Sequence, residues 1–123
     1  MNLKYTVGSI LSMPFLPLMY YQGKKIKASV PDLPEARGTE GVYNSEHSSL
    51  KPLQLLTIGE STIAGVGVAT HEEGFTGTLA KELSQLFQET VNWKVYAKSG
   101  YTAKKVTQTI IPEITEKDAD LIF

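Results

Sequence analysis

The sequence predicts an α/β fold in which helices cover a parallel sheet. Three short apolar segments are typical of buried strands. They lie at 53–59, 92–100 and 119–123. Two segments between them have apolar residues at helical spacing, and they lie at 75–89 and 102–111. Strands that alternate with helices are typical of a parallel sheet with helices on both faces. We therefore expect one α/β domain over 52–123.

The chain begins with an apolar segment, residues 1–23, that is expected to be helical. Its stretch 5–21 carries no charge and contains two prolines. It is slightly shorter than the about 20 apolar residues of a spanning helix. Three interpretations stay open: a kinked membrane helix, a signal peptide without a clear cleavage site, or a buried or interfacial helix of a soluble cytoplasmic protein. Three lysines between 24 and 27 follow the stretch. They favour membrane association with the later domain on the cytoplasmic side.

Residues 24–51 are predicted to be a linker. The stretch is rich in Pro, Gly, Ser and Glu and has neither a helical nor a strand period. Pro31 and Pro34 disfavour regular structure around them. The linker is either free or lies along the surface of the domain.

Each helix of the domain has a recognisable pattern. The apolar face of the first is expected to contain Phe75, Leu79, Leu83 and Leu86. In the second, Val106 and Ile110 lie four residues apart, and Thr102 is a suitable N-cap. Pro112 then interrupts or restarts this helix.

Two glycine-containing turns follow the first two strands, Gly-Glu-Ser-Thr at 59–62 and Ser-Gly-Tyr-Thr at 99–102. The carboxyl ends of parallel strands meet at one edge of a sheet, where such folds bind ligands. At a strand-to-helix turn, Ser61 would be exposed and followed by unpaired N–H groups that can stabilise an oxyanion. Gly100 would let a backbone N–H approach a ligand closely. A serine beside two convergent donors is the beginning of an acyl-transfer site.

Three segments, in this order, resemble the SGNH/GDSL hydrolase superfamily of lipases and esterases. "LLTIGESTIAGVG" (55–67) is similar to the block that holds the nucleophile, and "VYAKSGYTAKKV" (95–106) to the block whose glycine supplies an oxyanion N–H. "DADLIF" (118–123) looks like the strand that leads into the third block. The resemblance covers 53–123. It implies a flavodoxin-like three-layer α/β/α sandwich with a parallel sheet, here truncated, and hydrolysis of carboxylic esters through an acyl-serine intermediate without a cofactor or metal.

The resemblance also implies roles for individual residues. Ser61 matches the nucleophile, whose N–H also serves the oxyanion hole, and Gly100 matches the second donor. Gly59 matches the glycine before the nucleophile, and Glu60 stands where the family has an Asp that organises the turn. The family's third donor, an Asn, and its base, a His in a late Asp-x-x-His segment, are not found, and His71 does not match that base. We therefore expect the chain to be the amino-terminal part of a longer enzyme that acts on lipid, short acyl or acetyl esters.

The composition and charge of the chain argue against several other classes of function. The chain has no cysteine, a net charge of −1 and two histidines, His47 and His71, without metal-ligand spacing. No basic stripe suggests nucleic acid. A non-catalytic, membrane-anchored α/β binding module, or an inactive fragment, is the alternative to the enzyme. A nucleotide-binding domain is a weaker alternative, because Thr70 stands where a dinucleotide fingerprint needs its third glycine.

Tyr101 is expected either to line an acyl pocket or to lie on the surface.

Overall fold

The computed structural model describes residues 3–45 and 51–123. These residues belong to two compact units, Met1–Asp32 and Leu33–Phe123, which are treated separately below. The remaining part of the expected linker, 46–50, includes His47 and lies outside the described residues.

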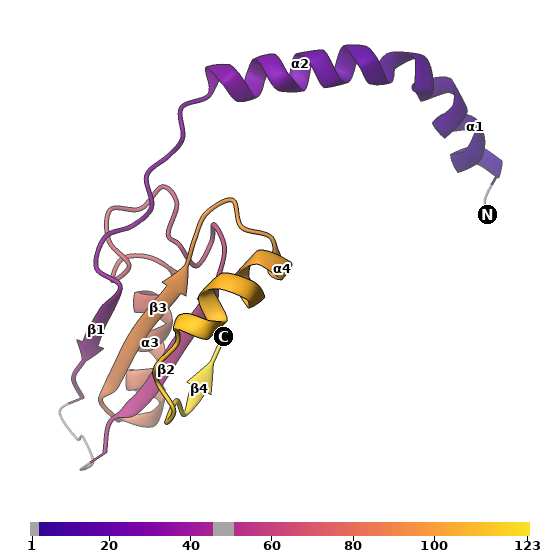
Figure 1. The fold of residues 1–123 in the computed structure, drawn as a ribbon. Helices are drawn as coiled ribbons and strands as arrows, with labels where there is room; N and C mark the ends of the chain where they lie inside the picture. Colours follow the sequence, from indigo (N-terminus) through magenta and orange to yellow (C-terminus); the bar gives the residue numbers. More distant parts are fainter. Residues whose placement is uncertain (1–2, 46–50) are drawn as a thin grey trace. The chain divides into compact units, whose positions relative to one another are not determined.

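The first unit is helical along almost its whole length (Figure 1). It contains α1 (Leu3–Ser12), the 3₁₀ helix η1 (Met13–Phe15) and α2 (Leu16–Ser29). Pro14 and Pro17 lie in the first turns of η1 and α2, where a missing N–H costs no helical hydrogen bond. Near these two prolines, the chain changes from α-helix to 3₁₀ helix and back to α-helix. No residue of α1 or α2 is buried. Within the described ranges, no helix has both the length and the apolar character needed to cross a membrane.

The second unit is built on a four-stranded mixed sheet. The strands are β1 (Glu40–Tyr43), β2 (Leu53–Gly59), β3 (Val91–Ala97) and β4 (Leu121–Ile122), in the order β1-β3-β2-β4. β2 is parallel to β3 and to β4, as predicted. The expectation of a wholly parallel sheet is wrong, because β1 pairs with β3 in the antiparallel sense.

Two parts of the expected linker have regular structure. α2 continues to Ser29, and β1 lies at the edge of the sheet. β1 pairs Gly41 with Trp93, and a Cβ at Gly41 would overlap the indole ring. The ring is buried, and its N–H has no acceptor among the described residues, so packing rather than hydrogen bonding holds it there. A strand of only four residues that includes a glycine shows no alternating apolar pattern, so β1 could not be recognised from the sequence.

The helix α3 (Phe75–Phe87) covers one face of the sheet. The core beneath it consists of Leu55, Ala80, Val91, Trp93 and Val95. Leu79 and Leu83 pack against this core, as predicted. Leu86 and Phe75 do not belong to the buried face, since they are 74% and 44% exposed. The buried stripe instead runs through Thr76, Ala80 and Ser84, small residues spaced by four that let α3 lie close to the sheet.

A short helical segment lies on the opposite side of the sheet from α3 (Figure 1). It is continuous along the chain as α4 (Ala103–Lys105), the π-helix η2 (Val106–Ile110) and the 3₁₀ helix η3 (Ile111–Glu113). The predicted N-cap is confirmed, since the Thr102 hydroxyl accepts a hydrogen bond of 3.3 Å from the Lys105 N–H. Ile110 is its buried anchor.

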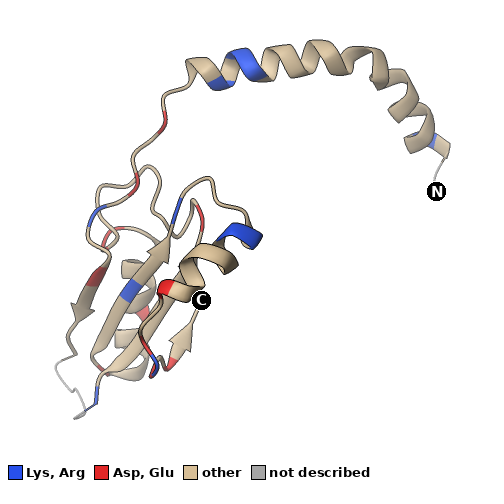
Figure 2. Cartoon of the chain, in the orientation of Figure 1, with Lys and Arg blue, Asp and Glu red and all other residues tan. Residues whose placement is uncertain are grey.

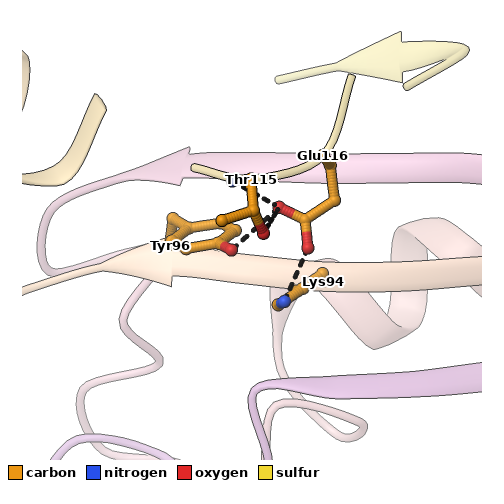
Figure 3. A network of polar contacts seen from close by, with 4 residues as sticks. All are labelled: Lys94, Tyr96, Thr115 and Glu116. Atoms are coloured by element: carbon orange, nitrogen blue, oxygen red, sulfur yellow. Dashed lines mark hydrogen bonds and ion pairs between the residues drawn. The ribbon is translucent and has the colours of Figure 1, made fainter. Parts of the chain in front are cut away.

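Glu116 attaches the loop after this segment to β3 (Figure 3). The Lys94 ammonium lies 2.6 Å from Glu116 Oε1, and the Tyr96 hydroxyl donates to Oε2 at 2.8 Å. These two contacts lower the pKa of Glu116 to about 2, and that of Lys94 is raised by its bond to Glu116. Lys94 and Glu116 therefore both stay charged near neutral pH, and their ion pair holds the loop in position.

Candidate functional site

The two glycine-containing turns lie at the same edge of the sheet. β2 and β3 are in parallel register as far as Gly59 opposite Ala97. Directly beyond this pair, the Lys98 N–H donates to the Gly59 carbonyl at 3.2 Å. The turns that follow the two strands therefore begin side by side, as the parallel topology predicts.

Ser61 is exposed, and its hydroxyl faces the neighbouring turn. Its Oγ lies 3.5 Å from the Oγ of Ser99. The chain then coils, with the Ala64 N–H donating to the Glu60 carbonyl at 2.7 Å and the Val66 N–H to that of Ser61 at 3.1 Å. Among residues 3–45 and 51–123, no group accepts a hydrogen bond from the backbone N–H of Ser61. The expected strand-to-helix turn is a longer loop here, because α3 begins only at Phe75.

The residues beside Ser61 have different roles. Gly59 makes room for Ile63: a Cβ at this glycine would lie 2.7 Å from Ile63 Cγ1. Glu60 is exposed, and within the described residues its carboxylate has no bonded partner. Its carbonyl, and not its side chain, helps to organise the turn through the Ala64 N–H. An acidic side chain at this position is therefore not needed for the turn in this chain.

Gly100 has the backbone conformation that favours glycine. Its φ is +78°, and open space surrounds the position of a Cβ. In the part of the chain that the structure describes, its N–H has no acceptor. Tyr101, next to it, is half-buried, carries the Lys105 ammonium 4.4 Å from its ring centroid and lines a hollow of about 200 Å³ with Tyr96 and Ile110. Tyr101 thus borders the site without being placed against Ser61.

Glu35 is a site-edge residue that sequence reasoning missed. Its Oε1 accepts a hydrogen bond of 2.7 Å from the Ser99 N–H, and its Oε2 lies 3.0 Å from the Lys98 ammonium. These contacts, with the Ser99 hydrogen bond as the larger cause, lower the pKa of Glu35. Glu35 stands in the proline-rich stretch that was expected to be a linker, and no pattern in that stretch indicates it.

His71 is a buried packing residue of the loop before α3. It is 4% exposed, its N–H donates to the Arg37 carbonyl at 2.9 Å, and its carbonyl accepts from the Gly77 N–H at 3.0 Å. Burial lowers the pKa of His71, and the charge of Glu35 opposes this change. The backbone hydrogen bonds of His71 hold the loop before α3 in place, and neither of them connects His71 with Ser61.

A larger concavity of about 830 Å³ lies on the sheet face that carries Lys94. Its lining includes Gln54, Leu56, Asn92 and Glu116, and it does not include Ser61. Within the described ranges, no three acidic or histidine side chains gather closely enough to hold a metal ion.

Comparison of the chain with family models, with curated proteins and with solved structures finds no match. The resemblance to the SGNH hydrolases rests on the three sequence segments and stays a prediction.

Proposed function

We propose that this protein is a serine hydrolase of the SGNH type that acts on carboxylic esters, with Ser61 as its nucleophile. One observation carries the proposal: an exposed Ser61 lies at the carboxyl ends of two adjacent parallel strands, 3.5 Å from the hydroxyl of Ser99 in the turn that contains Gly100. One backbone N–H group in each turn, that of Ser61 and that of Gly100, has no acceptor among the described residues. Unpaired donors near an exposed hydroxyl are what an oxyanion site requires.

The proposed reaction has two steps. Ser61 Oγ attacks the ester carbonyl carbon and passes its proton to a base, and the carbonyl oxygen becomes an oxyanion that accepts hydrogen bonds from the N–H groups of Ser61 and Gly100. The oxyanion collapses, and the alcohol leaves with the proton from the base. Water then attacks the acyl-serine, which releases the acid and restores Ser61. The resemblance implies as base the histidine of a late Asp-x-x-His segment and as third donor the Asn of the third block, and neither position has a match within 1–123.

The flavodoxin-like three-layer sandwich is proposed together with the activity. Its support is the parallel group β3-β2-β4 and the helical segments on opposite sides of it. In such folds the ligand site lies outside the carboxyl ends of the strands, which is where Ser61 stands.

A fluorophosphonate probe tests the nucleophile, because it modifies only activated serines. We expect the folded product of the reading frame that encodes these residues to be labelled, and Ser61→Ala to abolish labelling. Ser99→Ala is the matched control, since its hydroxyl is the neighbour of Ser61 and is expected to be dispensable for labelling.

Two results would contradict the proposal. Labelling that survives in Ser61→Ala and disappears in Ser99→Ala would make Ser99 the nucleophile. A folded protein that the probe does not label would favour the non-catalytic, membrane-anchored binding module.

We also propose that residues 5–21 contact a membrane surface and bring the esterase to lipid esters. Large apolar side chains along α1, η1 and α2 are exposed, among them Leu11, Phe15 and Leu18. The basic stretch of α2 follows them directly (Figure 2). An apolar helix with lysines beside it suits an interface with anionic lipid.

Vesicle co-sedimentation measures this association. Each lysine near an anionic surface contributes about 1 kcal/mol, so replacing Lys24, Lys25 and Lys27 together by Gln is expected to weaken binding to phosphatidylglycerol-containing vesicles at least about tenfold. The matched control replaces Lys81, Lys104 and Lys117, which changes the net charge equally and is expected to leave binding nearly unchanged. Equal losses in the two triple variants would show that net charge alone governs binding, and no binding by the unmodified protein would refute the membrane role.

A further inference from the structure

The short segment 34–37 connects the loop of Ser61 with the turn of Gly100. The Ala36 N–H donates to the Ala64 carbonyl at 3.0 Å, and the Arg37 N–H donates to the Ala69 carbonyl at 3.1 Å. Both acceptors belong to the loop that begins at Ser61. Glu35 directly precedes these two residues, and its side chain reaches the other turn.

The Glu35 carboxylate binds that turn with both of its oxygens. Oε1 accepts from the Ser99 N–H at 2.7 Å, and Oε2 pairs with the Lys98 ammonium at 3.0 Å. Ser99 in turn carries the hydroxyl that lies 3.5 Å from Ser61 Oγ. One side chain thus holds two successive residues of the turn while its own backbone neighbours are bonded to the opposite loop.

We propose that Glu35 is a positioning residue of the esterase site, which rests on the function proposed above. Its carboxylate holds the 98–100 turn so that the Gly100 N–H stays beside Ser61. The turn needs such support, because nothing lies within 4 Å of the position that a Cβ would take at Gly100, so side-chain packing on that side does not fix its left-handed conformation. A displacement of about 1 Å at a reacting group can lower a rate about 10²-fold.

Labelling rates of variants test this role. Glu35→Ala removes both contacts, and we expect the second-order rate of fluorophosphonate labelling at Ser61 to fall about 10- to 100-fold. Glu35→Gln keeps an oxygen that can accept from the Ser99 N–H but loses the charge that pairs with Lys98, so an intermediate rate is expected. Glu82→Ala, an exposed glutamate on α3, is the matched control and should retain the full rate. Thermal unfolding of each variant identifies losses that come from misfolding.

The amide resonance of Ser99 provides a readout that does not depend on catalysis. The contacts of Glu35 lower its pKa below the ordinary value of 4.5, with Lys98 and His71 as the charged or titratable groups that act on it. The Ser99 amide shift is therefore expected to follow the titration of Glu35 with a midpoint below pH 4.5, and this change should be absent in Glu35→Gln.

The outcomes separate the two proposals. If the unmodified protein is labelled and the Ser99 amide titrates, but Glu35→Ala is labelled at the full rate, the positioning role is overturned and the hydrolase stands. If the amide titrates and the folded protein is never labelled, the hydrolase itself is refuted, and the positioning role with it. A Ser99 amide that does not follow Glu35 would refute the contact on which the inference depends.

Discussion

Replacing Gly77 by alanine is expected to destabilise the second unit by about 3 kcal/mol, although alanine favours helices more than glycine does. Gly77 lies in the first turns of α3, where the chain at Glu72 crosses the helix. A Cβ at Gly77 would overlap the backbone of Glu72. Because the overlapping group is backbone, no side-chain rotation can relieve it. The loop between Ser61 and α3 would have to move away, with loss of the hydrogen bond from the Gly77 N–H to the His71 carbonyl.

Urea unfolding followed by tryptophan fluorescence measures this effect. Trp93 is the single tryptophan of the chain and lies in the core of the second unit, so its emission reports on that unit. Gly23→Ala is the matched control: it makes the same change within a helix, α2, and nothing lies within 4 Å of the new Cβ. We expect the control to leave the Trp93 transition unchanged. Equal midpoints for the two variants would mean that the crossing at Glu72 does not constrain α3.

The parts of the fold that sequence predicted are those with a repeating apolar pattern. The first strand was predicted with the bounds of β2, 53–59, because its apolar run is long and ends at a glycine. β1 was missed because it is short and its Gly41 is selected by contact with Trp93, which lies far away in the sequence. Leu86 was assigned to the buried face by its spacing, but in the structure the stripe toward the sheet consists of smaller residues.

The candidate site was predictable to a similar degree. That Ser61 and Gly100 lie at one edge follows from two parallel neighbouring strands, and this required only the order of elements along the chain. The Glu35 contact was not predictable, since it joins residues 64 positions apart and depends on how the segment 34–37 crosses the sheet edge. A carboxylate that accepts from a backbone N–H leaves no periodic signal in the sequence.

Gly100→Ala is expected to lower fluorophosphonate labelling of Ser61 at least about tenfold, approaching the about 10²- to 10³-fold that accompanies loss of one oxyanion donor. The substitution removes no N–H group. It acts because an L-residue at a φ of +78° costs about 1–2 kcal/mol, so the turn relaxes and its N–H moves away from Ser61.

Gly38→Ala provides the comparison that separates strain from catalysis. Gly38 belongs to the same unit, has a φ of +75° and is likewise surrounded by open space. The two substitutions should therefore cost similar free energies of unfolding, measured by Trp93 fluorescence. Only Gly100→Ala should slow labelling, since only Gly100 follows the strand beside Ser61. Equal labelling rates in the two variants would remove Gly100 from the proposed oxyanion site, whereas equal stability with unequal rates would assign the difference to the position of one N–H group.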